Sequence, residues 1–513
     1  MALALAVYCA PVGIAGTIVA INVKTQTSAP LATGFSGFNM PQLRNGVEYH
    51  DPKFVYAVGP LKPGWLRFPG GTASMAYDWN PADSSGGHID IGWMNSLITG
   101  NPASVSGQPA NILMASQQLT QAKGGVYLSE FATFVNAVGS QAIICFNGFT
   151  DTNPGSASLM AQAAQGAELP VAEWELANEP YVYPIIFPSA ASYANAMNPY
   201  FTGITSATPG ATIALFMAGT YPGNGVNYSS WDSGMSAYTP VYWNAVSTHA
   251  YPIPRIQSIS TTAQTLNGIL AHATADYINS YLNPLVGSNT PIYITELNCC
   301  APDSDKFLTF LYNGIFLAEY IARMSSVPNV KGVGVNSLYT DNYDYHGIIQ
   351  SVNDYESYLL NQVAANPNFS TDTATDPNTQ FQFYMSAPGL ALEVANQAIN
   401  SSNRIWPTTV TGGPLVAIQG FDGKAIPAVY AQAYRGTDGS HYVLITNKSS
   451  SVCSTTIQLN GVHVSATMSI TTVSNTSAYA SNTATAQNNV LIQTATSNNP
   501  IALGPYSVTV VKW

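Results

Sequence analysis

Two glutamates close short apolar runs of the chain and could act as a pair. Glu179 closes the run that contains Trp174, and Glu296 lies in the run that contains Tyr293. The chain has only ten Glu, so two at matching positions indicate a shared role, and with only 15 Lys and Arg a rim salt bridge is the weaker interpretation. Paired carboxyl groups serve glycoside hydrolysis: one protonates the leaving oxygen and the other attacks or stabilises the anomeric carbon. The sequence therefore predicts a carbohydrate-cleaving site built on Glu179 and Glu296.

The composition restricts the partners of such a site. Hydrophobic residues make up 46% of the 513 residues and charged residues only 8%, whereas an ordinary soluble domain carries about a quarter of charged residues. Lys and Arg number 15 against 26 Asp and Glu, a formal net charge of −11. This charge offers no positive field to a phosphate backbone, an anionic membrane or a sulfated polyanion such as heparan sulfate. We expect a carbohydrate substrate, no nucleic acid, no membrane partner, and a monomer.

Export is the expected fate of the chain. Residues 1–10 are apolar and the first charged residue is Lys24, so this stretch resembles an export segment that lacks a basic leader. The five cysteines include no Cys-x-x-Cys pair and no His partner at zinc spacing; they are Cys9, Cys145, Cys299, Cys300 and Cys453. We expect a secreted or periplasmic protein that uses neither a metal nor a cofactor.

Eight short apolar runs, separated by helical patterns, predict the scaffold that positions the two glutamates. The runs cover 34–39, 65–69, 142–147, 171–178, 212–218, 245–251, 292–298 and 333–339. Helical spacing of apolar residues covers 128–138, 191–204, 262–285 and 307–324, and a last helix is predicted over 381–399 after a polar rim loop over 353–379. Eight strand–helix units make a (β/α)8 barrel, an α/β fold whose active site lies at the carboxyl ends of the strands. Glu179 and Glu296 then end strands four and seven.

The chain changes character after residue 403. Six alternating, β-branched runs with polar turns predict an antiparallel β-sandwich. They cover 428–434, 442–446, 455–459, 468–473, 490–494 and 506–511. The early run 17–23 alternates in the same way and is expected to join this sandwich. The predicted domains are therefore 1–30 with N-terminal strands of the sandwich, 31–403 with the barrel, and 404–513 with the sandwich.

The motifs around the glutamates resemble the clan of retaining (β/α)8 glycosidases, in which Asn-Glu ends strand four and a second Glu ends strand seven. The segment Trp65-Leu66-Arg67-Phe68-Pro69-Gly70-Gly71, the flanking sandwich and the terminal strand 506–513 are similar to glycoside hydrolase family 79, the β-glucuronidase and heparanase group. The resemblance implies that Glu179 is the acid/base and Glu296 the nucleophile. It also implies that Asn178 holds the sugar 2-hydroxyl.

The same resemblance suggests roles for residues at other strand ends. Tyr251, in the segment that begins with the supporting residue His249, is expected to place a hydroxyl beside the nucleophile, or else to form part of the wall. Asn336 would supply a sugar-binding amide, and Tyr345, with Tyr343 as a rival, would bind the uronate carboxylate together with backbone N–H groups of 298–301.

Arg67 and two carboxylates on strand four are interpreted together. Glu173 and Glu175 point to the same side of their strand as each other and need a buried partner. Arg67 is the candidate for that partner, and its alternative role is to orient the nucleophile.

Two features leave the substrate open. Asn39 stands where relatives carry an acidic residue, so the hydroxyl pattern of the sugar can differ. Cys299 and Cys300 could form a strained vicinal disulfide on the rim or remain two thiols. We expect an exo-acting retaining β-glucuronidase. The alternatives are a retaining β-glycosidase for a neutral sugar, of the β-glucosidase or β-galactosidase type, and a non-catalytic carbohydrate-binding barrel.

Overall fold

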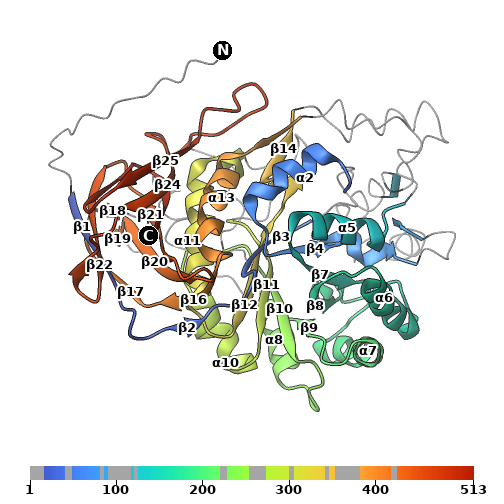
Figure 1. Cartoon of the computed structure of the whole chain (residues 1–513). Helices are drawn as coiled ribbons and strands as arrows, with labels where there is room; N and C mark the ends of the chain where they lie inside the picture. The colour runs from blue at the N-terminus through green and yellow to red at the C-terminus, as the bar shows by residue number, and fades with distance from the viewer. Residues whose placement is uncertain are drawn as a thin grey trace.

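A closed barrel of eight parallel strands forms the centre of the computed structural model (Figure 1). The structure describes residues 17–40, 49–80, 86–89, 117–118, 120, 125–219, 228–252, 273–299, 306–340, 346–352, 382–417 and 425–513. The barrel strands are β3 (Ser36–Asn39), β4 (Trp65–Phe68), β7 (Gln141–Phe146), β8 (Val171–Leu176), β9 (Ile213–Phe216), β10 (Ala245–Ala250), β11 (Ile292–Leu297) and β12 (Val330–Asn336). Each pairs with the next in the chain, and β12 returns to β3. All eight predicted runs are barrel strands, so the predicted fold class is confirmed.

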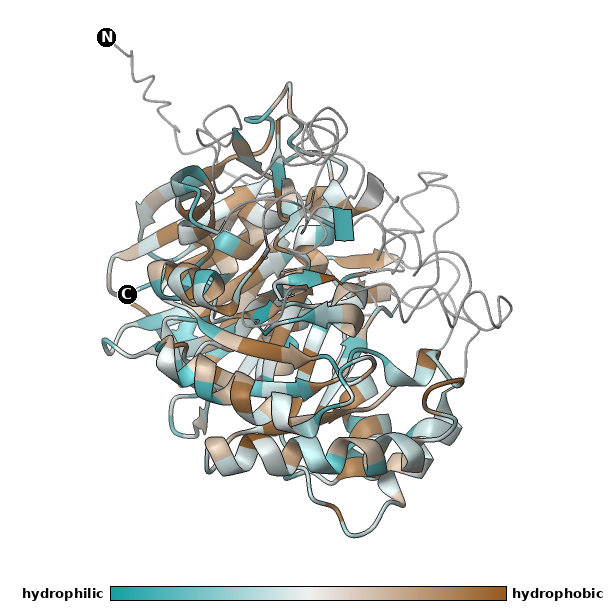
Figure 2. Ribbon diagram, turned by 90° about the vertical axis from the view of Figure 1, so that its right-hand side faces the viewer, coloured by the Kyte–Doolittle hydropathy of each residue, from teal (hydrophilic) through white to brown (hydrophobic). Residues whose placement is uncertain are grey.

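Helices surround the barrel and alternate with its strands. They are α2 (Pro52–Val58), α5 (Leu128–Val138), α6 (Pro154–Gly166), α7 (Ala190–Ala207), α8 (Ser229–Ser236), α10 (Asn283–Val286), α11 (Leu311–Ser325) and α13 (Ala387–Ile399). Coloured by hydropathy, these helices carry hydrophobic and polar residues side by side, as helices with one buried face do (Figure 2). Among the described helices, none is long and apolar enough to cross a membrane.

Two predicted helices differ from the structure. The helix predicted over 381–399 begins only at Ala387, because Ser386 caps it and accepts a hydrogen bond from the Gly389 N–H, while Phe383–Met385 form strand β15. β15 pairs with β14 (Ile349–Ser351), so a partner distant in the chain overrides the local helical spacing. In the helix predicted over 262–285, the described part is π-helical over Tyr277–Leu282 before α10. The predicted rim loop 353–379 lies outside the described residues.

Short strands accompany the barrel. β13 (Tyr339–Thr340) joins β14 and β15 in a three-stranded sheet, and β5 (Tyr77–Asp78) pairs with β6 (His88–Ile89). Within the sandwich region, β18 (Leu415–Ala417) pairs with β19 (Ala425–Pro427).

Two sheets form the C-terminal sandwich. The larger has the order β2-β16-β20-β21-β27-β24-β25, and the smaller has the order β17-β1-β22-β23 with β26 also on β22. Their bounds are β1 (Thr17–Val23), β2 (Ala29–Pro30), β16 (Ser402–Trp406), β17 (Thr408–Gly412), β20 (Val429–Gly436), β21 (His441–Asn447), β22 (Cys453–Leu459), β23 (Val462–His463), β24 (Met468–Ser474), β25 (Ile492–Ser497), β26 (Ile501–Leu503) and β27 (Ser507–Lys512). The N-terminal run therefore joins the sandwich as predicted, although β1 pairs with β22 in parallel. The exact domain boundaries stay predictions.

A buried ion cluster joins the sandwich to the barrel. Helices α11 and α13 lie between the two parts (Figure 1) and contact strands of the larger sheet. Glu319 of α11 is 1% exposed and accepts from Lys448 Nζ at 2.8 and 2.7 Å. It also accepts from Arg323 Nη2 at 2.7 Å and from the Thr446 hydroxyl at 2.7 Å. The Arg323 guanidinium lies 4.1 Å from the ring centroid of Tyr430 on β20.

A tryptophan fills the barrel interior below the polar residues. Trp65 on β4 is 2% exposed. A Cβ at Gly37 would lie 2.2 Å from its ring, and a Cβ at Gly334 would lie 2.1 Å from it, so only glycine leaves room for the indole. Because side chains alternate along a strand, Arg67 on β4 and Asn39 on β3 face the interior one step closer to the carboxyl ends.

Candidate active site

Glu179 stands just beyond β8 on a tight turn of the backbone. Ala177 has φ of 70° and Glu179 has φ of 47°, a left-handed conformation that residues with a Cβ rarely adopt. Such conformations cost energy and persist where the surrounding structure holds them, often at functional sites. The Glu179 side chain remains 31% exposed, so the turn presents a carboxyl at the mouth of the barrel.

Glu296 reaches the barrel interior because of a bulge in β11. Thr248 of β10 pairs with Ile294, but the next residue, His249, pairs with Glu296, so one residue of β11 is extra. The pairing of β11 with β12 shifts at the same place. As a result, Thr295 and Glu296 both make contacts inside the barrel, although neighbours on a regular strand point to opposite faces.

His249 lies between the two glutamates. Its Nδ1 is 2.8 Å from Oε1 of Glu179, and its Nε2 is 3.6 Å from Oε1 of Glu296. Burial alone would lower the pKa of His249, but the carboxylates of Glu296 and Glu179 together raise it. The ring of Phe216 packs edge-on against the imidazole with centroids 4.7 Å apart. One ring thus connects both members of the predicted pair.

A tyrosine and His249 share one oxygen of Glu179. The Tyr181 hydroxyl donates to Oε1 at 2.9 Å, and His249 Nδ1 contacts the same oxygen. Burial would raise the pKa of Glu179, but the charge of His249 and the two hydrogen bonds lower it. The contacts orient the carboxyl while part of its side chain stays open to solvent.

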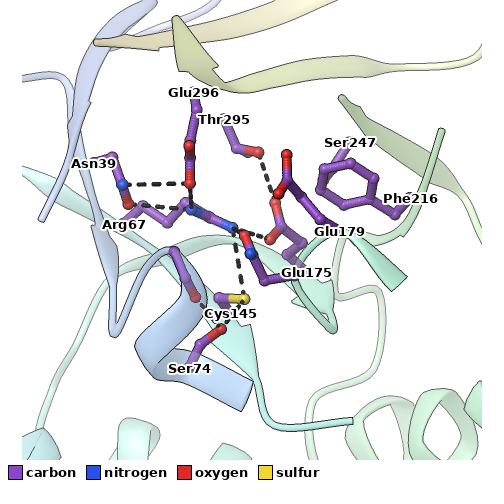
Figure 3. A network of polar contacts seen from close by, with 12 residues as sticks. Asn39, Arg67, Ser74, Cys145, Glu175, Glu179, Phe216, Ser247, Thr295 and Glu296 are labelled. Carbon is purple, nitrogen blue, oxygen red and sulfur yellow. Dashed lines mark hydrogen bonds and ion pairs between the residues drawn. The ribbon is translucent and has the colours of Figure 1, made fainter. Parts of the chain in front are cut away.

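Arg67 forms the centre of the network beneath the glutamates (Figure 3). It is fully buried, and its Nη1 donates to Oε1 of Glu296 at 2.8 Å. Its Nη2 contacts Oε1 of Glu175 and donates to Oδ1 of Asn178 at 2.7 Å. The same nitrogen lies 3.6 Å from the sulfur of Cys145. The two roles considered for Arg67 are therefore both present: it pairs with a buried carboxylate and it contacts the predicted nucleophile.

Amides and a phenol complete the surroundings of Glu296. The Tyr251 hydroxyl donates to Oε2 of Glu296 at 2.6 Å, and Asn336 Nδ2 donates to the Tyr251 oxygen at 2.8 Å. Asn39 Nδ2 donates to Asn336 Oδ1 at 2.9 Å and lies 3.4 Å from Oε1 of Glu296. A Cβ at Gly70, whose φ is 45°, would lie 2.0 Å from Oδ1 of Asn39, so this glycine makes room for the amide.

Two of the predicted site residues are not among those that the structure describes. Tyr345 and Cys300 lie outside the described residues, so the uronate-binding tyrosine and the vicinal disulfide stay predictions. Cys299 is buried, and its backbone N–H donates to Oδ1 of Asn298 at 2.8 Å. The Asn298 N–H donates to the Ala250 carbonyl at 3.2 Å. Of the backbone donors expected for a uronate, these two are therefore already engaged.

Glu173 does not pair with Arg67, which corrects the sequence interpretation. Its Oε1 accepts from the Ser247 hydroxyl at 2.7 Å. Burial, followed by the charge of Glu175, raises the pKa of Glu173 well above its ordinary value. Two residues before Glu175 on the strand, this carboxyl lies deeper in the barrel, and its raised pKa favours the neutral form, which needs no cation.

Sequence reasoning missed two site residues. Tyr181 follows Glu179 by two residues, and a hydroxyl so close to the predicted acid/base was an available signal. Thr295 precedes Glu296 directly and donates to Oε2 of Glu175 at 2.7 Å. No sequence signal could have placed Thr295, because regular alternation puts it on the face opposite to Glu296.

Several solved structures that match this fold over nearly their whole length are glycoside hydrolases. The GH51 arabinofuranosidase from Xanthomonas axonopodis pv. citri matches with a TM-score of 0.67 and 14% identity, over 97% of this chain and 99% of that one. The α-L-arabinofuranosidase from Thermotoga maritima matches with a TM-score of 0.66 and 15% identity, over 97% and 99%. A 4-O-α-L-rhamnosyl-β-D-glucuronidase from Fusarium oxysporum matches with a TM-score of 0.59 and 16% identity, over 96% and 100%.

These identities show likeness of fold. No family model and no curated protein sequence matches the chain. The likeness to the arabinofuranosidases and the glucuronidase extends over nearly the whole of each chain. Membership of family 79 stays a prediction, whereas the chain shares with these glycoside hydrolases the fold of a (β/α)8 barrel with a C-terminal sandwich.

Proposed function

We propose that the protein is an exo-acting retaining glycoside hydrolase. Glu296 is the nucleophile and Glu179 the acid/base. The observation that carries this proposal is the contact of one imidazole, His249, with both the Glu179 carboxyl at the barrel mouth and the buried Glu296 carboxyl. Asn178 and Asn39 lie beside them and would hold the sugar hydroxyls.

The reaction proceeds in two displacements. In the first, Glu179 protonates the glycosidic oxygen while the Glu296 carboxylate attacks the anomeric carbon, which gives a glycosyl ester of Glu296. In the second, Glu179 takes a proton from water, and that water hydrolyses the ester. The Tyr251 hydroxyl and Arg67 hold the attacking carboxylate in place. Since the first step needs protonated Glu179 and its pKa is lowered, activity is expected to favour acid.

A β-glucuronide is the first substrate class that we propose. The motifs around Trp65 and Glu179 resemble those of the β-glucuronidase group, and a glucuronidase shares the fold. In the described part of the site the two buried basic side chains, Arg67 and His249, both contact protein carboxyls. Neutral donors would then bind the uronate carboxylate.

An α-L-arabinofuranoside is the second candidate. The arabinofuranosidases have the higher TM-scores, 0.67 and 0.66 against 0.59 for the glucuronidase. Two of the backbone donors expected for a uronate are engaged within the protein, which also favours a neutral sugar. β-Glucosides and β-galactosides remain further neutral alternatives, since Asn39 can both donate to and accept from a hydroxyl.

A panel of aryl glycosides tests the function and separates the candidates. We expect release of 4-nitrophenol from the β-glucuronide, and slower release from the α-L-arabinofuranoside, β-glucoside and β-galactoside. Proton NMR of the first product should show the anomeric configuration of the substrate. Inversion would contradict the double displacement, a faster arabinofuranoside would change the sugar, and binding without release would support the non-catalytic alternative.

Replacement of Glu179 should separate the two chemical steps. Glu179→Ala removes the proton donor, so hydrolysis of substrates with poor leaving groups should fall about 10²–10⁴-fold. A dinitrophenyl glycoside needs little protonation and should still react to form the ester. Azide should then restore turnover and give a glycosyl azide with the configuration of the substrate.

A matched control comes from Glu168. Glu168 is exposed and also has a positive φ, 52°, so Glu168→Ala makes the same chemical change on a comparable backbone. It should leave all rates unchanged. Equal losses with good and poor leaving groups in Glu179→Ala would remove the acid/base assignment.

A further inference from the structure

One guanidinium is divided between two carboxylates in the barrel. Nη1 of Arg67 donates to Glu296, and Nη2 contacts Glu175, so the nucleophile shares its cation with a residue that is itself fully buried (Figure 3). A buried ion left without its partner is costly, so the three groups form one electrostatic unit.

Glu175 also forms a hydrogen bond with β11, the strand that carries Glu296. Its Oε1 is bound to Arg67 of β4, and its Oε2 accepts from the Thr295 hydroxyl of β11 at 2.7 Å. Thr295 is the residue next to Glu296, at the bulge that turns both side chains inward. Through these contacts one carboxylate on β8 fixes both the cation and the backbone that place Glu296.

Glu173 provides an internal comparison for Glu175. Both lie on β8 and both are fully buried. Burial alone would raise the pKa of Glu175, but the charge of Arg67, then that of His249, lower it, which favours the ionised form. The Glu173 carboxyl accepts a hydrogen bond from Ser247, and burial raises its pKa, which favours the neutral form. Two glutamates two positions apart in the sequence thus favour opposite forms, and only Glu175 contacts Arg67.

We propose that Glu175 is a positioning residue for Glu296: it balances the charge of Arg67 and holds Arg67 and Thr295, so that Glu296 is oriented without losing its reactivity. With Glu175 in place, Arg67 donates a hydrogen bond to Glu296 but brings little net positive charge to it. Without Glu175, the full charge of Arg67 would act on the Glu296 carboxylate and make it a weaker nucleophile.

The charges around Glu175 determine in which direction the pH profile of kcat/KM should move when its charge is removed. The titratable and charged groups that interact with it are Arg67 on β4, Cys145 on β7, Glu173 on β8, Tyr193 on α7 and His249 on β10. Glu296 on β11 shares Arg67 with it, and Glu179 after β8 contacts His249. Removal of one negative charge from this set favours the ionised form of every remaining carboxyl. Both limbs of the pH profile of kcat/KM should therefore move toward acid.

The decisive variant is Glu175→Gln, with Glu173→Gln as its matched control. Removal of one buried negative charge acts strongly on neighbouring charges in a medium of low dielectric constant, so both limbs should shift toward acid by about one pH unit. We expect kcat to fall about 10–100-fold through the loss of placement. Glu173→Gln replaces a neutral group by a neutral group and should shift neither limb. Loss of activity in Glu175→Gln without a shift, or an equal shift in Glu173→Gln, would overturn the proposal.

Two further variants keep the charge and so extend the test. Glu175→Asp and Thr295→Val should lower kcat while both limbs stay where they are in the wild type. A shift in either variant would contradict the assignment of the limbs to the charge of residue 175. If circular dichroism shows that Glu175→Gln does not fold, the proposal is tested by these two variants alone, through a lowered kcat with both limbs unshifted.

The proposal rests on the proposed function only for its effect on turnover. Carbon-13 NMR of glutamate-labelled protein follows ionisation directly, and with ten Glu the carboxyl spectrum is simple, with Glu179→Ala giving the assignment. Arg67 is among the groups that lower the pKa of Glu179, so the Glu179 signal should titrate at lower pH in Glu175→Gln than in the wild type. If the wild type hydrolyses no glycoside but this shift appears, the function fails and the positioning stands; if the signal does not shift, the positioning fails whatever the activity.

Discussion

Glu296→Gln should reduce kcat for every substrate of the enzyme by at least about 10⁴-fold, equivalent to about 5.5 kcal/mol of barrier. The amide has the shape of the carboxyl but cannot form the glycosyl ester, so the first displacement loses its nucleophile. Glu296 is 7% exposed and held by Arg67 and Tyr251, so no water can readily take its place. The measurement is kcat on the aryl glycoside that the wild type cleaves fastest.

Covalent labelling identifies the nucleophile independently of rate. A 2-deoxy-2-fluoro glycoside with a good leaving group forms the ester but hydrolyses slowly, and mass spectrometry of the digested protein should find the sugar on the peptide that contains Glu296. Glu168→Gln, a change at an exposed glutamate, should leave both the rate and the label unchanged. A label on another residue, or full activity in Glu296→Gln, would refute the assignment.

Glu319→Ala should destabilise the protein by about 3–5 kcal/mol, because it leaves Lys448 buried without a carboxylate. Lys448 is 2% exposed and its Nζ contacts both oxygens of Glu319. The loss should appear as an earlier transition in urea followed by circular dichroism. The double change Glu319→Met with Lys448→Met removes both charges and should recover most of the stability.

The effect of Glu319 should depend on pH. Burial alone would raise the pKa of Glu319, but Lys448 and Arg323 lower it. A carboxyl with a lowered pKa in the folded state stabilises the fold above its unfolded pKa, about 4.3, and this contribution is lost as pH falls through the folded pKa. The difference between wild type and Glu319→Ala should therefore be full at pH 7 and shrink in acid.

An exposed ion pair of the sandwich is the control for this prediction. Lys512 and Asp438 lie 3.2 Å apart with side chains 42% and 53% exposed. Solvent screens such a pair, so Asp438→Ala should leave the transition nearly unchanged. A similar loss in Asp438→Ala and Glu319→Ala would show that burial is not the cause.

The sequence by itself determined the scaffold and selected Glu179 and Glu296 as the proposed catalytic pair. Strands of a parallel barrel are covered on both sides and so appear as continuous apolar runs, which is why all eight could be located. The helix Leu128–Val138 was predicted with its observed bounds because its end depends on a neighbouring residue: Gly139, with φ of 69°, adopts the left-handed conformation that caps the helix. Glu179 and Glu296 could be paired because a barrel brings the carboxyl ends of all its strands together.

Local signals failed where a distant partner decides. The segment 381–385 has helical spacing, but Phe383–Met385 pairs with β14, more than thirty residues earlier. Likewise, Arg67 could be matched with Glu173, Glu175 or Glu296 on sequence grounds. The choice of Glu175 and Glu296 depends on the depth at which each side chain enters the barrel, which pairing between strands sets.

The bulge at Thr295 is the clearest case that only the tertiary structure decided. Alternation along a strand puts Thr295 and Glu296 on opposite faces. Both instead make contacts inside the barrel, because β11 carries one residue more than its neighbours β10 and β12 at that point. Register between strands arises from the closure of the whole barrel, and no feature of residues 292–298 alone records it.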